Sequence, residues 1–480
     1  MIRIFGHHLN TIALFLATIE LSLLLSIVLA SASLLQGLGL SAGPPDHLMI
    51  AVIVTLATAA GMISVGLYNR ENFFNWAKSM SRAIVIFPLM LAVLVGALWL
   101  FDRIVHSGIS HREHYLLCAL GLALFLPLFL VARRIFVLIV AHTGAFTRRV
   151  AVLGSGARAG KIERLSQHDQ GLNYQIAGYV HLDETPGQPA VQPVPAVCRR
   201  KSSRQEDYQI KPGELTRFCQ LHRVEELVVV SHERRGLPVS ELLECKLAGV
   251  GVIEYVSFWE RESHQLDLAE TTPGWLVFSD GFKTGLIRRL VKRIFDIVAS
   301  VTLLVLTLPL LLLTALLIKL ESPGSVFYVQ ERVGLDGKIF TIFKFRSMRS
   351  DAEAGGPRWA AQRDARVTRI GALIRKIRID EIPQAINVLK GDMAFVGPRP
   401  ERPVFVQSFI EKIPFYGARH RVKPGITGWA QINYPYGSGE EDAKIKLCYD
   451  LYYVKNGSIF LDIIVMMQTI KVLIWSAGAR

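Results

Sequence analysis

Apolar residues dominate the first 142 positions of the chain, where they form four long runs. The runs cover approximately residues 11–35, 48–68, 83–101 and 115–140. A membrane-crossing helix needs ~20 consecutive apolar residues, and each run is close to that length. The third run is the shortest and by itself would also suit a buried helix of a water-soluble protein. Because four such runs follow one another, the pattern predicts a four-helix transmembrane bundle over residues 1–147.

Lys and Arg residues are unevenly distributed between the loops of this bundle. The loop at 36–47 has none, the loop at 69–82 has three and the loop at 102–114 has two. Four arginines lie towards or after the end of the fourth run. Short loops rich in Lys and Arg remain in the cytoplasm. We therefore expect both ends of the bundle to be cytoplasmic.

Residues 148–282 have shorter apolar runs, which are typical of an α/β module. Three buried strands of the parallel type are expected at 149–154, 174–180 and 226–230. Between the first strand and an expected helix, Gly154-Ser-Gly-Ala-Arg-Ala159 has the GxGxxA form of a dinucleotide-binding fingerprint. Such a turn either holds a nucleotide at the helix N-terminus or only connects strand to helix. A lone motif favours the second interpretation, a structural Rossmann-like module.

A fifth apolar run covers approximately 294–319 and contains Pro309 near its middle. A proline inside a helix removes one hydrogen bond and bends the helix. The run is therefore either a fifth membrane span or a re-entrant helix over 290–320 that breaks at Pro309 and returns to the same face. We favour the re-entrant helix, because an even number of crossings keeps the charged segment after it on the cytoplasmic side. The last apolar run, 459–475, contains Asp462, Gln468 and Lys471 and suits a helix lying at the membrane interface.

The net charge of +14 is concentrated in the C-terminal part of the chain. From Lys283 onward there are 30 Lys and Arg residues against 17 Asp and Glu residues. With 51% hydrophobic residues, this charge suits an anionic membrane surface and anionic substrates. The sequence has no zinc-finger, RNA-recognition or helix-turn-helix pattern, so we expect no nucleic-acid partner. The five cysteines are scattered, which indicates neither a disulfide framework nor a zinc site.

The adjacent acids Asp380 and Glu381 lie inside this basic part of the chain. Basic residues precede them at 375, 376 and 378 and follow them at 390, 399 and 402. Acids among cations are typical of phosphate chemistry, in which a carboxylate attacks or binds a metal and the cations neutralise phosphoryl oxygens. The simpler interpretation is two adjacent acids on the surface that form ordinary ion pairs. The motifs around Asp380 and Glu381 favour a role in phosphate chemistry.

Six ordered motifs accompany the two acids. They are Gln330-Glu-Arg-Val-Gly334, Phe343-Lys-Phe-Arg-Ser-Met348, Asp380-Glu-Ile-Pro-Gln384, Asn387-Val-Leu-Lys-Gly-Asp-Met393, Val396-Gly-Pro-Arg-Pro400 and Pro424-Gly-Ile-Thr-Gly-Trp-Ala-Gln-Ile-Asn433. In this order they resemble the bacterial sugar transferases, also called monotopic phosphoglycosyl transferases or polyprenyl-phosphate hexose-1-phosphate transferases. The resemblance covers about 283–480. The complete layout is similar to the large exopolysaccharide members, and more weakly to those linked to exosortase systems.

The resemblance implies an architecture and a reaction. The architecture is a membrane protein of the α + α/β class: the four-helix bundle (1–147), a Rossmann-like cytoplasmic module (148–282) and a mainly helical catalytic domain with a re-entrant helix (283–480). The implied enzyme moves a sugar 1-phosphate from a UDP-sugar to undecaprenyl phosphate at the cytoplasmic face of the bacterial inner membrane. Its product is used by downstream glycosyltransferases, and the resemblance also leaves room for a homodimer.

The resemblance further assigns roles to individual residues. Asp380 is the nucleophile that carries a covalent phosphosugar, Glu381 is the second acid, and both are expected to bind Mg²⁺. Arg375 and Arg399 are expected to hold phosphates, for which their planar guanidinium groups are suited. Lys344 and Arg346 are assigned either to donor binding or to the structure of the domain. Pro309 matches the proline that breaks the re-entrant helix.

Three other functions have to be weighed against this one. A membrane-anchored nucleotide-sugar dehydratase or epimerase needs a Tyr-x-x-x-Lys pair, and no tyrosine of the chain has lysine four residues later. A non-enzymatic scaffold for polysaccharide assembly would not need the acids and arginines that are present. A transporter is disfavoured, because Glu20 is the one acid within the four runs and no paired repeats are visible.

Overall fold

The computed structural model organises the chain as two compact units. It describes residues 2–4, 7–38, 47–69, 75–105, 112–144, 147–168, 174–182, 207–231, 237–282, 285–349, 352, 365–434, 437 and 439–475. The first unit consists mainly of His8–Met62 and Leu67–His264. The second consists mainly of Gln265–Arg480, together with the short segments Arg3–His7 and Ile63–Gly66. The main change from one unit to the other therefore falls at residue 265.

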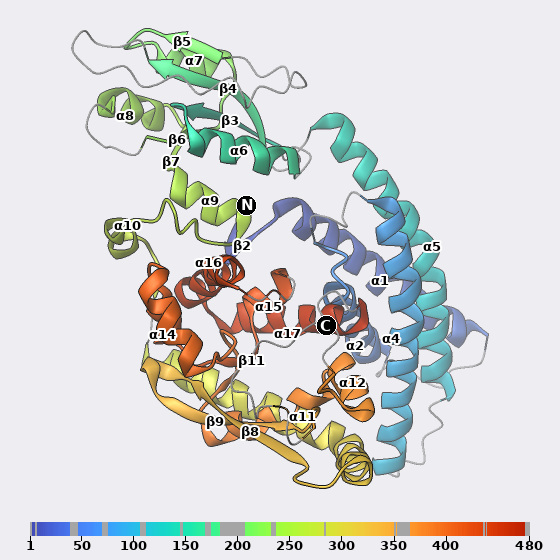
Figure 1. Ribbon diagram of the computed structural model, residues 1–480. Helices are drawn as coiled ribbons and strands as arrows, with labels where there is room; N and C mark the ends of the chain where they lie inside the picture. Colours follow the sequence, from blue (N-terminus) through green and yellow to red (C-terminus); the bar gives the residue numbers. More distant parts are fainter. Residues whose placement is uncertain are drawn as a thin grey trace. The chain divides into compact units, whose positions relative to one another are not determined.

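The four N-terminal apolar runs all fold as helices (Figure 1). They are α1 (Thr11–Gly37), α2 (His47–Ser64), α4 (Trp76–Val105) and α5 (Arg112–Thr143). By length and hydropathy, Thr11–Gly37, Trp76–Gly96 and Tyr115–Val140 can cross a membrane, and Leu48–Ser64 is a shorter apolar helix. The helices predicted for this region are confirmed, with the second one shorter than expected. Their composition makes the protein a membrane protein.

A buried polar cluster lies inside this helical region. Arg133 of α5 donates a hydrogen bond to Glu20 of α1 at 3.0 Å, and the Tyr68 hydroxyl donates to the other Glu20 oxygen at 2.7 Å. Arg133 also donates to the carbonyl of Leu67. The Arg133 and Glu20 side chains are 1% and 0% exposed. Charged groups within apolar surroundings are stable when they are paired, so the cluster ties α1 to α5.

The rest of the first unit is a five-stranded parallel sheet in the order β5-β4-β3-β6-β7. The strands are β3 (Arg148–Leu153), β4 (Tyr174–Leu182), β5 (Asp207–Ile210), β6 (Glu226–Val229) and β7 (Gly251–Glu254). The helices α6 (Ala157–His168), α7 (Leu215–Leu221), α8 (Val239–Leu247) and α9 (Tyr255–Ser263) accompany it (Figure 1). This strand order is the one found in Rossmann-like folds. The three predicted strands are confirmed, and β5 and β7 add to them.

The fingerprint turn between β3 and α6 is stabilised by the chain itself. Gly154 has φ +108°, and a Cβ there would lie 2.9 Å from Cγ2 of Val230, so glycine is required. The buried Arg158 donates to the carbonyl of Ser231 at 2.9 Å and stacks on the Tyr255 ring. These contacts give the turn a structural role. Nothing in them requires a bound nucleotide.

The second unit is mainly helical. Its helices are α10 (Pro273–Phe278), α11 (Leu286–Glu321), α12 (Arg369–Lys376), α13 (Gln384–Lys390), α14 (Pro403–Lys412), α15 (Trp429–Asn433), α16 (Glu440–Asn456) and α17 (Ile459–Trp475), with 3₁₀ turns η2 (Leu335–Gly337), η3 (Ile379–Glu381) and η4 (Tyr416–Arg421). β8 (Phe327–Val333) and β9 (Ile339–Phe345) form an antiparallel hairpin. β10 (Ala394–Val396) and β11 (Gly425–Thr427) pair in parallel. Most described residues of the six motifs therefore belong to one compact unit.

This unit begins earlier than the expected boundary at Lys283. The Leu266 N–H donates to the Cys448 carbonyl at 3.0 Å, and the Phe282 N–H donates to the Lys455 carbonyl at 2.9 Å. The Lys455 ammonium lies 4.0 Å from the centre of the Trp275 ring. These contacts attach residues 266–282 to α16. The composition of this segment gives no sign of them, because its partners lie about 180 residues later in the chain.

The N-terminus also contributes to the second unit. Two short strands, β1 (Ile2–Ile4) and β2 (His7–Leu9), precede α1. The buried His7 hydrogen-bonds the Tyr452 hydroxyl at 2.8 Å and packs edge-on against Trp429. Trp429 is the first residue of α15. A residue from the start of the chain therefore supports a helix near its end.

One face of helix α11 is turned towards the rest of the second unit. The buried residues on this face are Asp296, Ser300, Thr314 and Ile318. The positions between Ser300 and Thr314 that line a cavity are Leu303, Thr307 and Leu310. These positions recur every three or four residues, so they share one face of the helix. The other faces expose leucines such as Leu306 and Leu312. A helix of this length extends about 54 Å, and Leu286–Glu321 is also long and apolar enough to cross a membrane. It packs against the rest of the unit on both sides of the cavity.

Contacts at the two ends of α11 show this arrangement. Arg293 donates to the carbonyl of Leu389 at 2.7 Å, and Asp296 accepts from the Phe395 N–H at 3.0 Å. At the other end, Ile318 packs against Ile374 and Ile379. The helix is assigned without interruption through Pro309, because loss of one hydrogen bond does not end a helix whose neighbouring bonds remain. The break at Pro309 and the re-entrant course stay predictions.

Candidate active site

The two central acids lie in a tight turn between two helices. Thr368 caps α12 by accepting a hydrogen bond from the Gly371 N–H at 2.9 Å. α12 ends at Lys376, and Arg378 then adopts a left-handed conformation with φ +61°. This reversal leads into η3, which carries Asp380 and Glu381. Both acids are buried, with exposed fractions of 9% and 8%.

Glu381 is surrounded by three cations. Its Oε1 accepts hydrogen bonds from Lys344 Nζ at 2.8 Å and from Arg399 Nη2 at 2.7 Å. Arg378 Nη1 lies 3.7 Å from its Oε2. Burial alone would raise the pKa of Glu381, but Arg399 and Lys344, followed by Arg378, hold it well below its usual range. Glu381 is therefore ionised at neutral pH.

Asp380 is in a different state from its neighbour. Its Oδ1 is buried and accepts no hydrogen bond from the described residues. Burial and the charge of Glu381 raise the pKa of Asp380 to about 6, against the opposing effect of Lys344, Arg378 and Arg375. The group is mainly ionised at neutral pH, and one of its oxygens has no partner. A carboxylate of this kind is suited to nucleophilic attack.

Lys344 is positioned by a contact between β9 and α13. The fully buried Asn387 accepts from the Phe343 N–H at 3.0 Å and donates to the Thr341 carbonyl at 2.7 Å. These two bonds align β9 with α13, so that Lys344 lies opposite Glu381. Two residues later, Arg346 donates to the carbonyls of Ser322 and Pro323 at 2.8 and 2.9 Å. The contacts of Arg346 favour the structural alternative, and its role in donor binding stays a prediction.

The two arginines expected to hold phosphates occupy different places. Arg375 lies in the last turn of α12 and lowers the pKa of Asp380. Arg399 lies beside Glu381 and lines the cavity. Its loop runs so close to β11 that a Cβ on Gly397 would come within 2.3 Å of the Lys423 carbonyl oxygen. Glycine at this position lets the two segments approach.

Arg419 holds the backbone of Arg399 in place. Its Nη2 donates to the Arg399 carbonyl at 2.9 Å and pairs with Asp450 at 2.8 Å, while its Nη1 donates to the Tyr416 hydroxyl at 2.7 Å. The Asp450 and Tyr416 side chains are both buried. Arg419 belongs to none of the six sequence motifs. Its only sequence signal is a place in the basic stretch just before the Pro424 motif.

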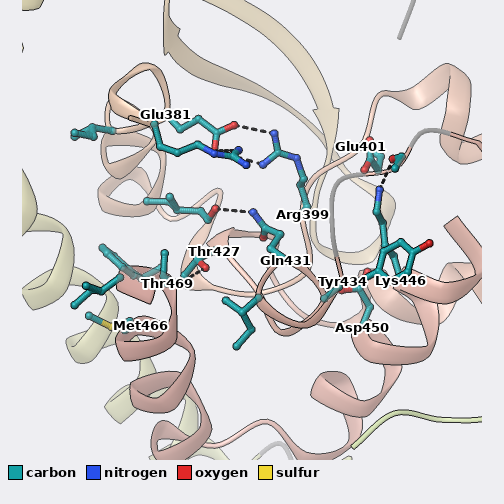
Figure 2. Close-up of a pocket in the computed structure, with 18 of the residues that line it drawn as sticks. Glu381, Arg399, Glu401, Thr427, Gln431, Tyr434, Lys446, Asp450, Met466 and Thr469 are labelled. Atoms are coloured by element: carbon teal, nitrogen blue, oxygen red, sulfur yellow. Dashed lines mark hydrogen bonds and ion pairs between the residues drawn. The ribbon is translucent and has the colours of Figure 1, made fainter. Parts of the chain in front are cut away.

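A cavity of about 630 Å³ opens between these elements. Figure 2 shows Glu381 and Arg399 on one side of it, with Met466 and Thr469 of α17 on another. The apolar wall consists of residues from α11 and α17, namely Leu303, Thr307, Leu310, Met466, Thr469 and Ile470. On the far side of Arg399 the lining is polar and includes Glu401, Tyr434 and Lys446. The cavity therefore joins an apolar wall, a cationic centre and a polar end.

The expected Mg²⁺ site can be compared with these side chains. Carboxylate oxygens are the ligands that Mg²⁺ prefers, and the unpartnered Oδ1 of Asp380 fits this role. Glu381 fits less well, because its oxygens already face cations. Among the described residues, no three or more His, Cys, Asp or Glu side chains are grouped for metal binding. Asp380 thus suits Mg²⁺ better than Glu381 does, as part of a ligand set that substrate oxygens and water would complete.

Comparison with known proteins places this site in a family. The family model described as bacterial sugar transferase matches residues 287–476. A UDP-glucose:undecaprenyl-phosphate glucose-1-phosphate transferase of Caulobacter vibrioides is 34% identical over 265 residues, which cover 52% of this chain and 99% of the relative. The chain belongs to the bacterial sugar transferase family. The predicted resemblance is thereby confirmed.

Other relatives match the same part of the chain. A UDP-N-acetylgalactosamine-undecaprenyl-phosphate N-acetylgalactosaminephosphotransferase of Aeromonas hydrophila is 50% identical over 190 residues, covering 40% of this chain and 45% of the relative. A UDP-glucose:undecaprenyl-phosphate glucose-1-phosphate transferase of Escherichia coli K12 is 42% identical over 186 residues, covering 38% and 40%. The chain thus matches less than half the length of these two relatives. The match with family members falls mainly on the second unit, where the site lies.

Proposed function

We propose that the protein transfers a sugar 1-phosphate from a UDP-hexose to undecaprenyl phosphate and so initiates exopolysaccharide assembly. The observation that carries this proposal is the cavity that joins the apolar wall of α11 and α17 to the Glu381–Arg399 pair beside Asp380. A polyprenyl phosphate has an apolar chain and an anionic head, and the wall and the cations match these two parts. The names of the family members support the same reaction class.

The reaction proceeds in two steps. The Asp380 carboxylate forms a bond to the β-phosphorus of the donor, and the pyrophosphate P–O bond breaks, so that UMP leaves with the bridging oxygen. A phosphate oxygen of undecaprenyl phosphate then attacks the same phosphorus and releases Asp380. Arg399 and Arg378 neutralise phosphoryl oxygens in both steps. Lys344 keeps Glu381 ionised and in place beside the nucleophile.

Glu381 and Asp380 have different roles because their environments differ. Glu381 is held ionised by its cations and balances them when no substrate is present. Asp380 keeps one oxygen free for the phosphorus. When bound by these two carboxylates, Mg²⁺ would neutralise charge on the donor diphosphate. Arg375 opposes the rise in the pKa of Asp380, and we keep for it the phosphate-binding role that the family resemblance implies.

The contacts of α11 support a position for the site at the membrane surface. The helix packs against the rest of the second unit around Asp296–Ser300 and Thr314–Ile318, lines the cavity between these positions, and exposes leucines on its other faces. A helix that crossed the bilayer would carry part of its length away from a water-exposed domain. In our proposal α11 re-enters at the cytoplasmic face of the inner membrane, and its apolar surroundings bring the lipid phosphate to Asp380.

The proposal is tested by UMP release. Full-length protein in lipid nanodiscs is incubated with undecaprenyl phosphate and, in turn, UDP-glucose, UDP-galactose and their N-acetylated analogues. UMP release that requires one of these donors together with the lipid phosphate, and that Asp380→Asn abolishes, is the expected result. Absence of UMP release with every donor, from protein that is folded, would exclude the proposed reaction.

A further inference from the structure

The polar end of the cavity has no part in the chemistry described above. It lies beyond Arg399 and is lined by Glu401, Tyr434 and Lys446, while Gln431 lines the same cavity between Arg399 and Thr427 (Figure 2). These side chains come from the segment after β10, from α15 and the residue that follows it, and from α16. The sequence assigned no role to any of them, although Gln431 belongs to the Pro424 motif. Three elements therefore bring hydrogen-bonding groups together next to the cationic centre.

The side-chain amide oxygen of Gln431 accepts no hydrogen bond from the described residues. The Gln431 Nε2 donates to the Ile426 carbonyl at 3.2 Å, which fixes the orientation of the amide. Its Oε1 is buried and has no hydrogen-bond partner among the described residues. A buried acceptor without a partner destabilises a protein unless another molecule supplies the missing donor. Gln431 lines the cavity, so a ligand in the cavity can supply it.

Glu401 offers further acceptors at the polar end of the cavity. Arg332 lies 3.7 Å from its carboxylate, but the guanidinium donates instead to Pro400 and Gln330 at 3.1 and 2.6 Å. No described residue donates a hydrogen bond to the Glu401 side chain. Burial lowers the pKa of Lys446, against the opposing effect of the nearby Glu401 charge, and Lys446 donates to the Gly437 carbonyl at 2.6 Å. The cavity is thus lined by two acceptor groups, one on each side of Arg399, and by the ammonium beside Glu401.

This set of groups selects one ligand chemistry. A carboxylate and an amide oxygen repel phosphate, which the cations around Glu381 attract. They accept hydrogen bonds from hydroxyl groups, and an ammonium can donate to the same hydroxyls. Glu401 is two residues from Arg399, so their Cα atoms are at most ~7 Å apart. A sugar ring joined directly to a phosphate held by Arg399 would reach Glu401.

We propose that Glu401 and Gln431 bind hydroxyl groups of a sugar ring in the nucleotide-sugar donor, with Lys446 donating to the hydroxyl at Glu401. The inference rests on the proposed function, because it takes the ligand of the cavity to be a nucleotide sugar. Two parts of such a donor carry vicinal hydroxyls, the hexose and the ribose. The polar end thereby becomes the part of the site that distinguishes one donor from another.

Binding measurements test this inference without requiring turnover. The full-length protein carries Asp380→Asn, so that the donor is not consumed, and is placed in nanodiscs. Dissociation constants are measured for UDP-glucose, UDP-N-acetylgalactosamine, UMP and 2′-deoxy-UMP. Glu401→Gln and Gln431→Met are compared with this parent. Glu441→Gln is the matched control, because it makes the same change on the exposed surface of α16, with a side chain that is 82% exposed.

We expect Glu401→Gln and Gln431→Met each to raise the Kd of the better-bound UDP-sugar at least tenfold and Glu441→Gln to leave it unchanged. An unchanged Kd for UMP assigns the hexose hydroxyls. A parallel rise for UMP, with 2′-deoxy-UMP binding weakly to the parent, assigns the ribose.

The inference is wrong if both variants bind UDP-sugars and UMP within twofold of the parent. It is also wrong if the parent binds neither UDP-sugar. Thermal unfolding shows whether each variant is folded. If the Glu401→Gln variant is unfolded, the Kd values of the Gln431→Met variant decide the test. Donor binding without any UMP release from the protein with Asp380 intact would exclude the proposed function and leave this inference in place.

Discussion

Replacement of Arg399 is the sharpest test of the cationic centre. Arg399 donates to Glu381 Oε1 at 2.7 Å, lies 3.4 Å from its Oε2, and also lines the cavity. Arg399→Ala removes a donor aimed at developing negative charge, for which a loss of ~10²–10³ in rate is typical, or about 2.7–4 kcal/mol. Arg399→Lys keeps the charge but cannot hold two oxygens together, so we expect a loss of about tenfold or more.

The fold should survive this replacement. Glu381 keeps Lys344 at 2.8 Å and Arg378 at 3.7 Å, so its charge is not left alone. We expect the free energy of unfolding to fall by about 1.5 kcal/mol, the lower end for a hydrogen bond to a charged group.

The assay is kcat/KM for UMP release, measured beside thermal unfolding. Arg421→Ala is the control, because that arginine is 76% exposed and pairs with Asp336 on the surface. If Arg399→Ala stays within fivefold of the wild-type rate, Arg399 does not act on the transition state. If the rate of Arg399→Ala falls only in proportion to the loss of folded protein, the role of Arg399 is structural.

Four further outcomes are expected. Asp380→Asn should abolish both lipid-linked product and the mass increase of a phosphosugar adduct, and near-normal turnover would exclude it as nucleophile. Glu381→Gln should impair turnover severely in a folded protein, because Lys344 and Arg399 lose their counter-charge; unchanged rates would make Glu381 merely structural. A cysteine replacing Lys319 should resist membrane-impermeant reagents added outside intact cells, whereas efficient labelling would mean that α11 crosses the membrane. A truncated protein that begins at Gln265 should keep more UMP-releasing activity than one that begins at Lys283, which lacks the contacts of Leu266 and Trp275 with α16; equal activities would contradict the importance of these contacts. A folded but inactive full-length Gly156→Val variant would contradict the structural role given to the first unit.

Periodicity and local motifs predicted much of the fold. The apolar runs became helices and the strands at 149–154, 174–180 and 226–230 joined one parallel sheet, because these features depend on residues close together in the chain. The acids of the site were also identified from their surroundings in the sequence. The unpartnered oxygen of Asp380 and the paired state of Glu381 were not, because they depend on which cations the fold brings near.

What sequence reasoning missed depends on long-range contacts. Arg419 supports Arg399 and Asn387 aligns Lys344 with Glu381, yet neither residue has a local pattern that indicates such a role. Arg346 was grouped with Lys344 because they are neighbours in one motif. It lies two residues after Lys344, just past the end of β9, and its guanidinium contacts the residues that follow α11 instead. The attachment of His7 to Tyr452 joins residues that are 445 positions apart.

The Glu20–Arg133 pair has a consequence for the synthesis of the protein. Glu20 enters the membrane with α1, but its partner belongs to α5 and is made more than a hundred residues later. Until then the acid is uncompensated in an apolar environment, which is costly. The N-terminal helices therefore reach their paired arrangement only after α5 has been made, and a chain that ends before Arg133 leaves Glu20 without its counter-charge.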